Sequence, residues 1–146
     1  MKTTIHHRAF AIAALVIFLV SFFLPAFDQM PGWKAAILHG LLWPQAVQGN
    51  LFAVHYLLLT FANILMVISP FLITWGVSDA RFVKWLRGLS LAAMALVWLF
   101  LARLLADHNG HDLRIGCYLW AFSFPLLCLA ALLQPMPLKT KTAQTA

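Results

Sequence analysis

Residues 51–75 read LFAVHYLLLTFANILMVISPFLITW, an apolar stretch without Asp, Glu, Lys or Arg. A helix that crosses the hydrocarbon core of a bilayer needs about 20 mostly apolar residues, because roughly 30 Å is covered at 1.5 Å per residue. This stretch meets that length with no charge to bury. It therefore predicts a membrane-spanning helix, and the other apolar stretches are found before and after it along the chain.

Three further apolar stretches of similar length lie at residues 9–27, 84–105 and 115–134; the first and last also lack charged residues, whereas 84–105 includes Lys84, Arg87 and Arg103. Hydrophobic residues make up 63% of the chain and charged residues 10%, against roughly 25% charged residues in ordinary soluble domains. That balance excludes a disordered tail, a coiled coil and a soluble secreted enzyme. We expect residues 1–146 to form a single membrane domain, an all-α integral membrane protein with four transmembrane helices in a bundle.

The first stretch begins like a signal peptide, since Lys2 and Arg8 precede its apolar run. The run is longer than the apolar core of most signal peptides, and the bulky Phe27 stands where cleavage needs a small residue. We expect this segment to be retained as the first transmembrane helix.

The stretch between the first two spans contains a shorter apolar run, WKAAILHGLLW, at residues 33–43. It is too short to cross the bilayer, and Trp33 and Trp43 bracket it as aromatic residues do at the membrane surface. We expect a short interfacial helix here, in the first extracytoplasmic loop. A re-entrant dip or a structured lid over the bundle is the alternative.

The ten basic residues are unevenly divided between the two sides of these helices. Seven lie in the tails and the second loop, and three lie in the first and third loops with the adjoining helix ends. The positive-inside rule then predicts cytoplasmic N- and C-termini, and the short basic flanks suggest a multi-pass protein of a bacterial inner membrane. The net charge of +6 indicates orientation and attraction to anionic lipid, with no nucleic-acid partner, because the basic residues are scattered.

Two polar side chains inside the second span are candidates for a ligand or partner site. His55 and Asn63 are eight residues apart, so they lie on broadly one side of a helix. They are suited to line a ligand path, to carry a proton or to bind a haem iron. The alternative is that they form hydrogen bonds between helices. A haem clasped between helices needs two inward-facing histidines, and only His55 lies inside a predicted span.

The third loop concentrates potential metal ligands. Asp107, His108, His111 and Asp112 occur within six residues, and His39 is predicted on the same side of the membrane. Imidazole and carboxylate together suit zinc, or less specifically copper or nickel. The alternative is a solvated polar turn built on Asn109-Gly110. We expect no cofactor, with this divalent metal site as the exception to test.

Packing predictions follow from tryptophan and alanine. Trp98 and Trp120 lie within predicted spans, and we expect both to pack between helices. The third span contains Ala92, Ala93 and Ala95, which would allow a neighbouring helix to approach closely.

A four-helix plan with both ends inside is similar to that of the small multidrug exporters. That resemblance implies cation export driven by a Glu within the first helix, whereas this sequence has no Glu and no Asp within a predicted span. No GxSxG, HExxH or Walker motif occurs.

We therefore expect a non-enzymatic accessory or interaction subunit, including an immunity-type protein against a membrane-active toxin. Its partner, another membrane protein or a second copy, would be recognised by helix faces and by the Trp33–Trp43 segment. The alternatives are a small transporter or pore-forming oligomer that uses the face of His55 and Asn63, and an outer-face metal- or haem-binding membrane protein.

Overall fold

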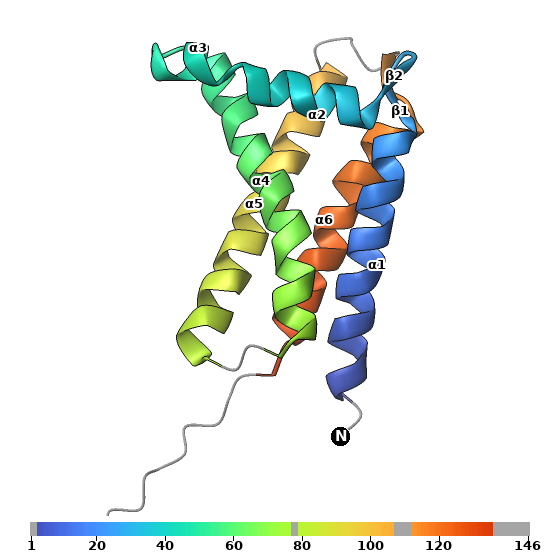
Figure 1. Ribbon diagram of the computed structural model, residues 1–146, viewed down its shortest axis with the longest axis vertical. Helices are drawn as coiled ribbons and strands as arrows, with labels where there is room; N and C mark the ends of the chain where they lie inside the picture. Colours follow the sequence, from blue (N-terminus) through green and yellow to red (C-terminus); the bar gives the residue numbers. More distant parts are fainter. Residues whose placement is uncertain (1–2, 77–78, 107–111, 136–146) are drawn as a thin grey trace, which may run out of the picture.

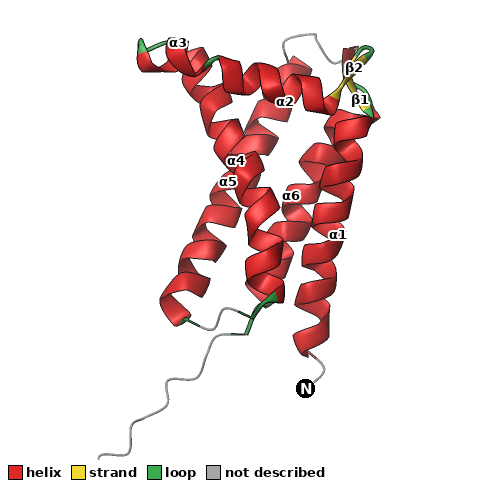
Figure 2. Cartoon of the chain, viewed as in Figure 1, coloured by secondary structure: helices red, strands yellow, loops and turns green. Residues whose placement is uncertain are grey.

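Four long helices form a bundle in the computed structural model, which describes residues 3–76, 79–106 and 112–135. They are α1 (Thr3–Phe23), α4 (Leu51–Thr74), α5 (Ala80–Ala106) and α6 (Ile115–Leu133). All four are long and apolar enough to cross a membrane. The chain is thus an all-α bundle of membrane-spanning helices (Figure 2).

The first helix ends earlier than the sequence pattern of residues 9–27 predicts. It stops at Phe23, and the chain continues as an antiparallel hairpin of β1 (Pro25–Phe27) and β2 (Met30–Pro31). Pro25 explains the difference, because the residue before a proline is driven out of the helical conformation. The turn passes through Asp28, whose φ of 47° is left-handed.

The fifth helix begins earlier than the predicted start at residue 84. Its first residue is Ala80, and the preceding Asp79 accepts a bond from the Arg81 backbone N–H through Oδ1 at 2.9 Å. A carboxylate at this place satisfies a helix donor that has no partner within the helix. The cap therefore extends the helix by one turn into its basic flank.

The hairpin is fastened to the chain just before α6. Phe27 forms a bridge with Leu113, the Asp28 N–H donates to the Asp112 carbonyl at 2.7 Å, and the Arg114 N–H donates to the Ala26 carbonyl at 3.0 Å. The Arg114 guanidinium also lies 3.6 Å from the Asp28 carboxylate. We call residues 25–31 with 112–114 the clasp, since together they join the end of α1 to the start of α6.

Two short helices follow the clasp in place of the one interfacial helix expected at 33–43. They are α2 (Gly32–Leu41) and α3 (Trp43–Val47), with the break at Leu42 because Pro44 occupies the first turn of α3. In Figure 1 both lie across the bundle at the clasp end, transverse to the long helices. We refer to this as the α2 end.

The most extensive contact between two helices is that of α1 with α6, through small side chains. Ala11 and Ala14 of α1 and Ala121 and Ala130 of α6 are all buried, which lets the two backbones approach closely. Of the three alanines of α5 that were expected to allow close approach of a neighbouring helix, only Ala93 is buried, while Ala92 and Ala95 are exposed. The expectation for Trp98 is wrong, since it is 45% exposed on the outer surface of the bundle.

Candidate functional site

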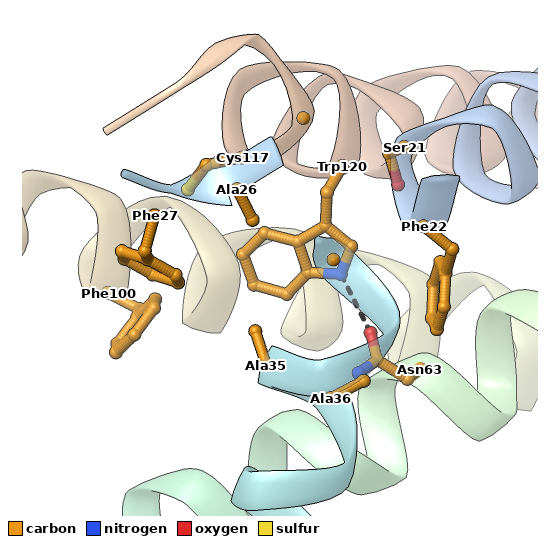
Figure 3. Close-up of a pocket in the computed structure, with 12 residues that line it drawn as sticks. Ser21, Phe22, Ala26, Phe27, Ala35, Ala36, Asn63, Phe100, Cys117 and Trp120 are labelled. Carbon is orange, nitrogen blue, oxygen red and sulfur yellow. Dashed lines mark hydrogen bonds between the residues drawn. The ribbon is translucent and has the colours of Figure 1, made fainter. Parts of the chain in front are cut away.

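A small cavity lies beneath α2, between that helix and the long helices (Figure 3). Its volume is about 30 Å³ and its lining comes from α1, β1, α2, α4, α5 and α6: Ser21, Phe22, Ala26, Phe27, Gly32, Ala35, Ala36, Asn63, Phe100, Gly116, Cys117 and Trp120. One water molecule needs roughly 10–15 Å³, whereas small-molecule pockets measure about 300–1,000 Å³. The central cavity alone therefore has room for about two waters and not for a drug-sized ligand.

Asn63 and Trp120 join α4 to α6 at this cavity. The indole Nε1–H of Trp120 donates to Oδ1 of Asn63 at 2.8 Å (Figure 3). The Ser21 hydroxyl instead donates to the Phe18 carbonyl of its own helix at 2.6 Å. The lining residues described include neither a carboxylate nor an imidazole. The polar groups at the cavity are an amide, an indole, a hydroxyl and the thiol of Cys117. Of the two roles predicted for Asn63, the structure shows the interhelical bond.

This bond is expected to contribute about 1 kcal/mol to the stability of the bundle, the usual size for polar pairs between membrane helices. The test is a double-mutant cycle of Trp120→Phe and Asn63→Leu, measuring the free energy of unfolding in mixed micelles. A coupling energy near zero would show that the two side chains act independently.

His55 lies on the same helix as Asn63 but enters a different contact. Its ring stacks on Phe100 of α5, with centroids 5.5 Å apart and planes at 29°. Its Nε2 is buried and has no hydrogen-bond partner within the described part of the chain. The two predicted residues are therefore not brought into one polar site, although both face the interior.

A continuous series of ring contacts connects all four long helices. Phe18 of α1 meets Phe124 of α6, Phe124 meets Trp120, and Trp120 meets Phe100, which contacts Tyr56 and His55 of α4. These centroid distances lie between 5.5 and 6.4 Å, the range in which aromatic pairs attract. Sequence reasoning expected Trp120 inside but missed this series, because no spacing along one helix shows which rings meet.

Two shallow grooves flank α4 and border the cavity. Each has a volume of about 310 Å³. The α1/α4 groove is lined by Phe18, Phe22, Ala36, Thr60, Asn63, Ile64, Val67 and Ile68. The α4/α5 groove is lined by Phe27, Met30, Ala35, Leu38, Leu42, Tyr56, Phe100 and Leu104. Ala35 and Ala36 of α2 thus lie between the cavity and the two grooves.

The predicted metal site falls mostly beyond the structure. Asp107, His108 and His111 lie outside the described residues, and for His39 only its place on α2 is described. Asp112 is exposed, and its backbone carbonyl belongs to the clasp. Within residues 3–76, 79–106 and 112–135, no three His, Cys, Asp or Glu residues are grouped to hold a metal ion.

Trp33 and Trp43 are both exposed. Trp33 is 44% exposed and Trp43 is 58% exposed, and the ammonium of Lys34 lies 5.4 Å from the centre of the Trp33 ring. Neither side chain lines the cavity beneath α2. The predicted partner residues on α2 and α3 are thus separate in space from the pair on α4.

No protein-family model, curated protein or solved structure matches the chain.

Proposed function

We propose that the chain is a small, non-enzymatic membrane protein that works by binding another integral membrane protein. The surface that carries this proposal is the outward side of α2 with α3, formed by Trp33, Ile37, Leu41, Trp43 and Val47. We call it the α2–α3 face. All five side chains are between 44% and 75% exposed. An immunity protein bound to a toxin in the membrane would be one protein of this kind.

The two sides of α2 support this assignment. Ala35 is buried and faces the cavity with Ala36, whereas Ile37 and Leu41 lie one turn apart on the other side. The inner side is thus filled by small residues that fit the bundle, and the outer side carries large apolar ones. The large apolar residues on the outer side are not needed to cover the cavity, so they are available to contact lipid or another membrane protein.

The position of α3 gives further support. It packs on α4 through Ala46, which is buried, while Trp43 and Val47 are exposed on a segment that extends past α4 in Figure 1. Gln45, Gln48 and Asn50 border it as exposed polar residues. An exposed apolar patch with a polar rim marks a surface that contacts a protein or the membrane, and tryptophan contributes strongly where proteins bind.

The proposal includes an inner-membrane location with both termini in the cytoplasm. The N-terminal end of α1 and the C-terminal end of α6 lie at the end of the bundle opposite α2 (Figure 1). Arg8, Arg81, Lys84 and Arg87 lie toward that end, in keeping with the excess of positive charge in cytoplasmic segments. The α2–α3 face would then meet its partner on the outer side of the membrane.

Photo-crosslinking in native membranes tests the partner. A photoreactive residue replaces Leu41 of the α2–α3 face in one variant and Leu99 of α5 in a matched control, because both leucines are 65% exposed. We expect the probe at position 41 to form one adduct with a different integral membrane protein and the probe at 99 to label only lipid. Adding Ile37→Ser should lower the adduct at 41 about tenfold, as loss of a central apolar contact does.

Three results would count against this function. Labelling of lipid alone at position 41 would show that the face rests on the bilayer. An adduct of twice the chain mass would identify the partner as a second copy. An adduct that Ile37→Ser leaves unchanged would place the contact elsewhere.

A further inference from the structure

The side-chain oxygen of Asn63 accepts a hydrogen bond within the described part of the protein, whereas its Nδ2 group donates none there. Indole nitrogen can only donate a hydrogen bond, so the 2.8 Å contact with Trp120 Nε1 requires the Asn63 oxygen to face α6. The Nδ2 group must then face the other way. In Figure 3 it lies toward Ala36 of α2. The oxygen and nitrogen of an amide are nearly alike in shape, so they are assigned here by the indole, which can only donate.

Among the described residues, the one hydrogen bond of the Asn63 side chain is the bond that its oxygen accepts from Trp120, so its two N–H donors have no acceptor there. Asn63 lines the α1/α4 groove as well as the central cavity. The other polar side chain of the groove, Thr60, already donates to the Tyr56 carbonyl at 3.1 Å. Asn63 is therefore the remaining hydrogen-bond donor of an otherwise apolar groove.

Such a donor needs an acceptor from outside the chain. The groove lies between two helices long enough to cross a membrane. Beyond the roughly two waters that the central cavity has room for, hydrocarbon offers little water to satisfy a donor, and an unpaired polar group there costs several kcal/mol. The position of Asn63 thus favours a ligand that brings an acceptor together with apolar bulk.

The groove has a shape suited to a hydrocarbon chain, and the Asn63 amide lies toward the end of the groove that is nearer to α2. Phe22 in the last turn of α1 and Ala36 of α2 place its upper part near the α2 end. Below Asn63 it continues along Ile64, Val67 and Ile68, which are 42% to 48% exposed and so open to the side. An acyl ester has the same order, a carbonyl near the membrane surface and a hydrocarbon chain pointing inward.

We propose that the α1/α4 groove binds one acyl chain of a diacyl phospholipid from the leaflet at the α2 end, with Asn63 Nδ2 donating to its ester carbonyl. Its volume of about 310 Å³ lies at the lower end of the range for ligand pockets. The bound lipid would pack against α1 and α4 and cover the side of the Trp120–Asn63 bond. This site is independent of the protein partner proposed above, because no residue of the α2–α3 face lines the groove.

The test compares two lipids that differ only in the acceptor. Purified, delipidated protein is mixed with diester or diether phosphatidylglycerol of equal chain length, and bound lipid is counted by native mass spectrometry. The diether lacks the carbonyl. We expect wild type to retain the diester about tenfold better, which corresponds to one hydrogen bond in a membrane. Asn63→Leu should remove this preference.

Two further variants separate recognition from packing. Trp120→Phe breaks the same interhelical bond but keeps the amide, so it should keep the preference for the ester. Ala36→Leu adds bulk in the groove and should lower the retention of both lipids several-fold. Thermal melting of each variant confirms that it is folded before lipid is counted.

Several outcomes would overturn the proposal. These are equal retention of diester and diether by wild type, a preference that persists in Asn63→Leu or is lost in Trp120→Phe, and unchanged retention by Ala36→Leu. Displacement of the diester by an equimolar short-chain quinone would show that the groove takes a quinone instead.

Discussion

Replacing Gly116 with alanine is expected to destabilise the protein by about 1–3 kcal/mol, the usual cost of forcing an extra group into a packed interior. A Cβ at this position would lie 2.7 Å from the Pro25 carbonyl oxygen and 2.9 Å from that of Leu24. Both are backbone atoms, so neither can turn away as a flexible side chain would. The substitution must move α6 away from the hairpin and strain the clasp.

The predicted loss of stability is opposite to what a glycine-to-alanine change in a helix normally produces. Alanine favours a helix over glycine by about 1 kcal/mol when nothing else changes. Gly88 of α5 has open space where its Cβ would be, so Gly88→Ala is the matched control and should leave stability unchanged or raise it. Gly32→Ala should behave like Gly116→Ala, because its Cβ would lie 2.5 Å from the Ser21 carbonyl oxygen.

Unfolding of the purified variants in mixed micelles measures both signs in one experiment. If Gly116→Ala were as stable as Gly88→Ala, the close approach of the hairpin to α6 would be wrong. Because α2 starts directly after the hairpin, a loosened clasp should also weaken crosslinking from position 41, even though Gly116 is remote from the α2–α3 face.

Replacing Arg87 with alanine is expected to cost about 2–3 kcal/mol, as the loss of several charge-assisted bonds at a helix end does. The Arg87 side chain of α5 donates to the carbonyls of Ala131 at 3.0 Å, Leu132 at 3.0 Å and Gln134 at 2.5 Å. These carbonyls belong to the last turn of α6 and the residue that follows it, where no further backbone N–H of the helix can reach them. A single guanidinium thus caps one spanning helix from another.

Lysine and a second arginine serve as comparisons. Arg87→Lys keeps the charge but has no planar fork to reach several carbonyls at once, so its stability should lie between those of wild type and Arg87→Ala. Arg81→Ala removes an exposed arginine from the first turn of the same helix and should change stability by less than about 0.5 kcal/mol. Hydrogen exchange at the last turn of α6 should rise in Arg87→Ala; equal protection in both alanine variants would argue against the cap.

Some parts of the architecture can be read from particular residues. The stretch at 51–75 forms α4 (Leu51–Thr74) and the stretch at 115–134 forms α6 (Ile115–Leu133), since apolar length is visible along the chain. The earlier end of α1 and the break at Leu42 were also within reach, because Pro25 and Pro44 limit the conformation of their neighbours. These features depend on residues that are adjacent in the sequence.

The candidate sites were less accessible to sequence reasoning. Asn63 could be recognised as a polar residue in a span, but its role depends on Trp120, which is 57 residues away. Nothing in the sequence indicates that Phe100 would stack on His55 instead of contacting lipid. The metal ligands expected in the third loop stay a prediction, because Asp107, His108 and His111 lie outside the described residues.

The number of spans, and a segment between the first two that is too short to cross, could be predicted from the order of the residues, because hydrophobicity and length are local properties of the chain. Three contacts became visible only once the helices were packed together: Gly116 accommodates the hairpin, Arg87 caps α6 across 44 to 47 positions, and the Asn63 oxygen accepts from the Trp120 indole. Each of these depends on which helices are neighbours and on which sides face one another. Those contacts are selected by the packing of the whole bundle, so no single segment contains them.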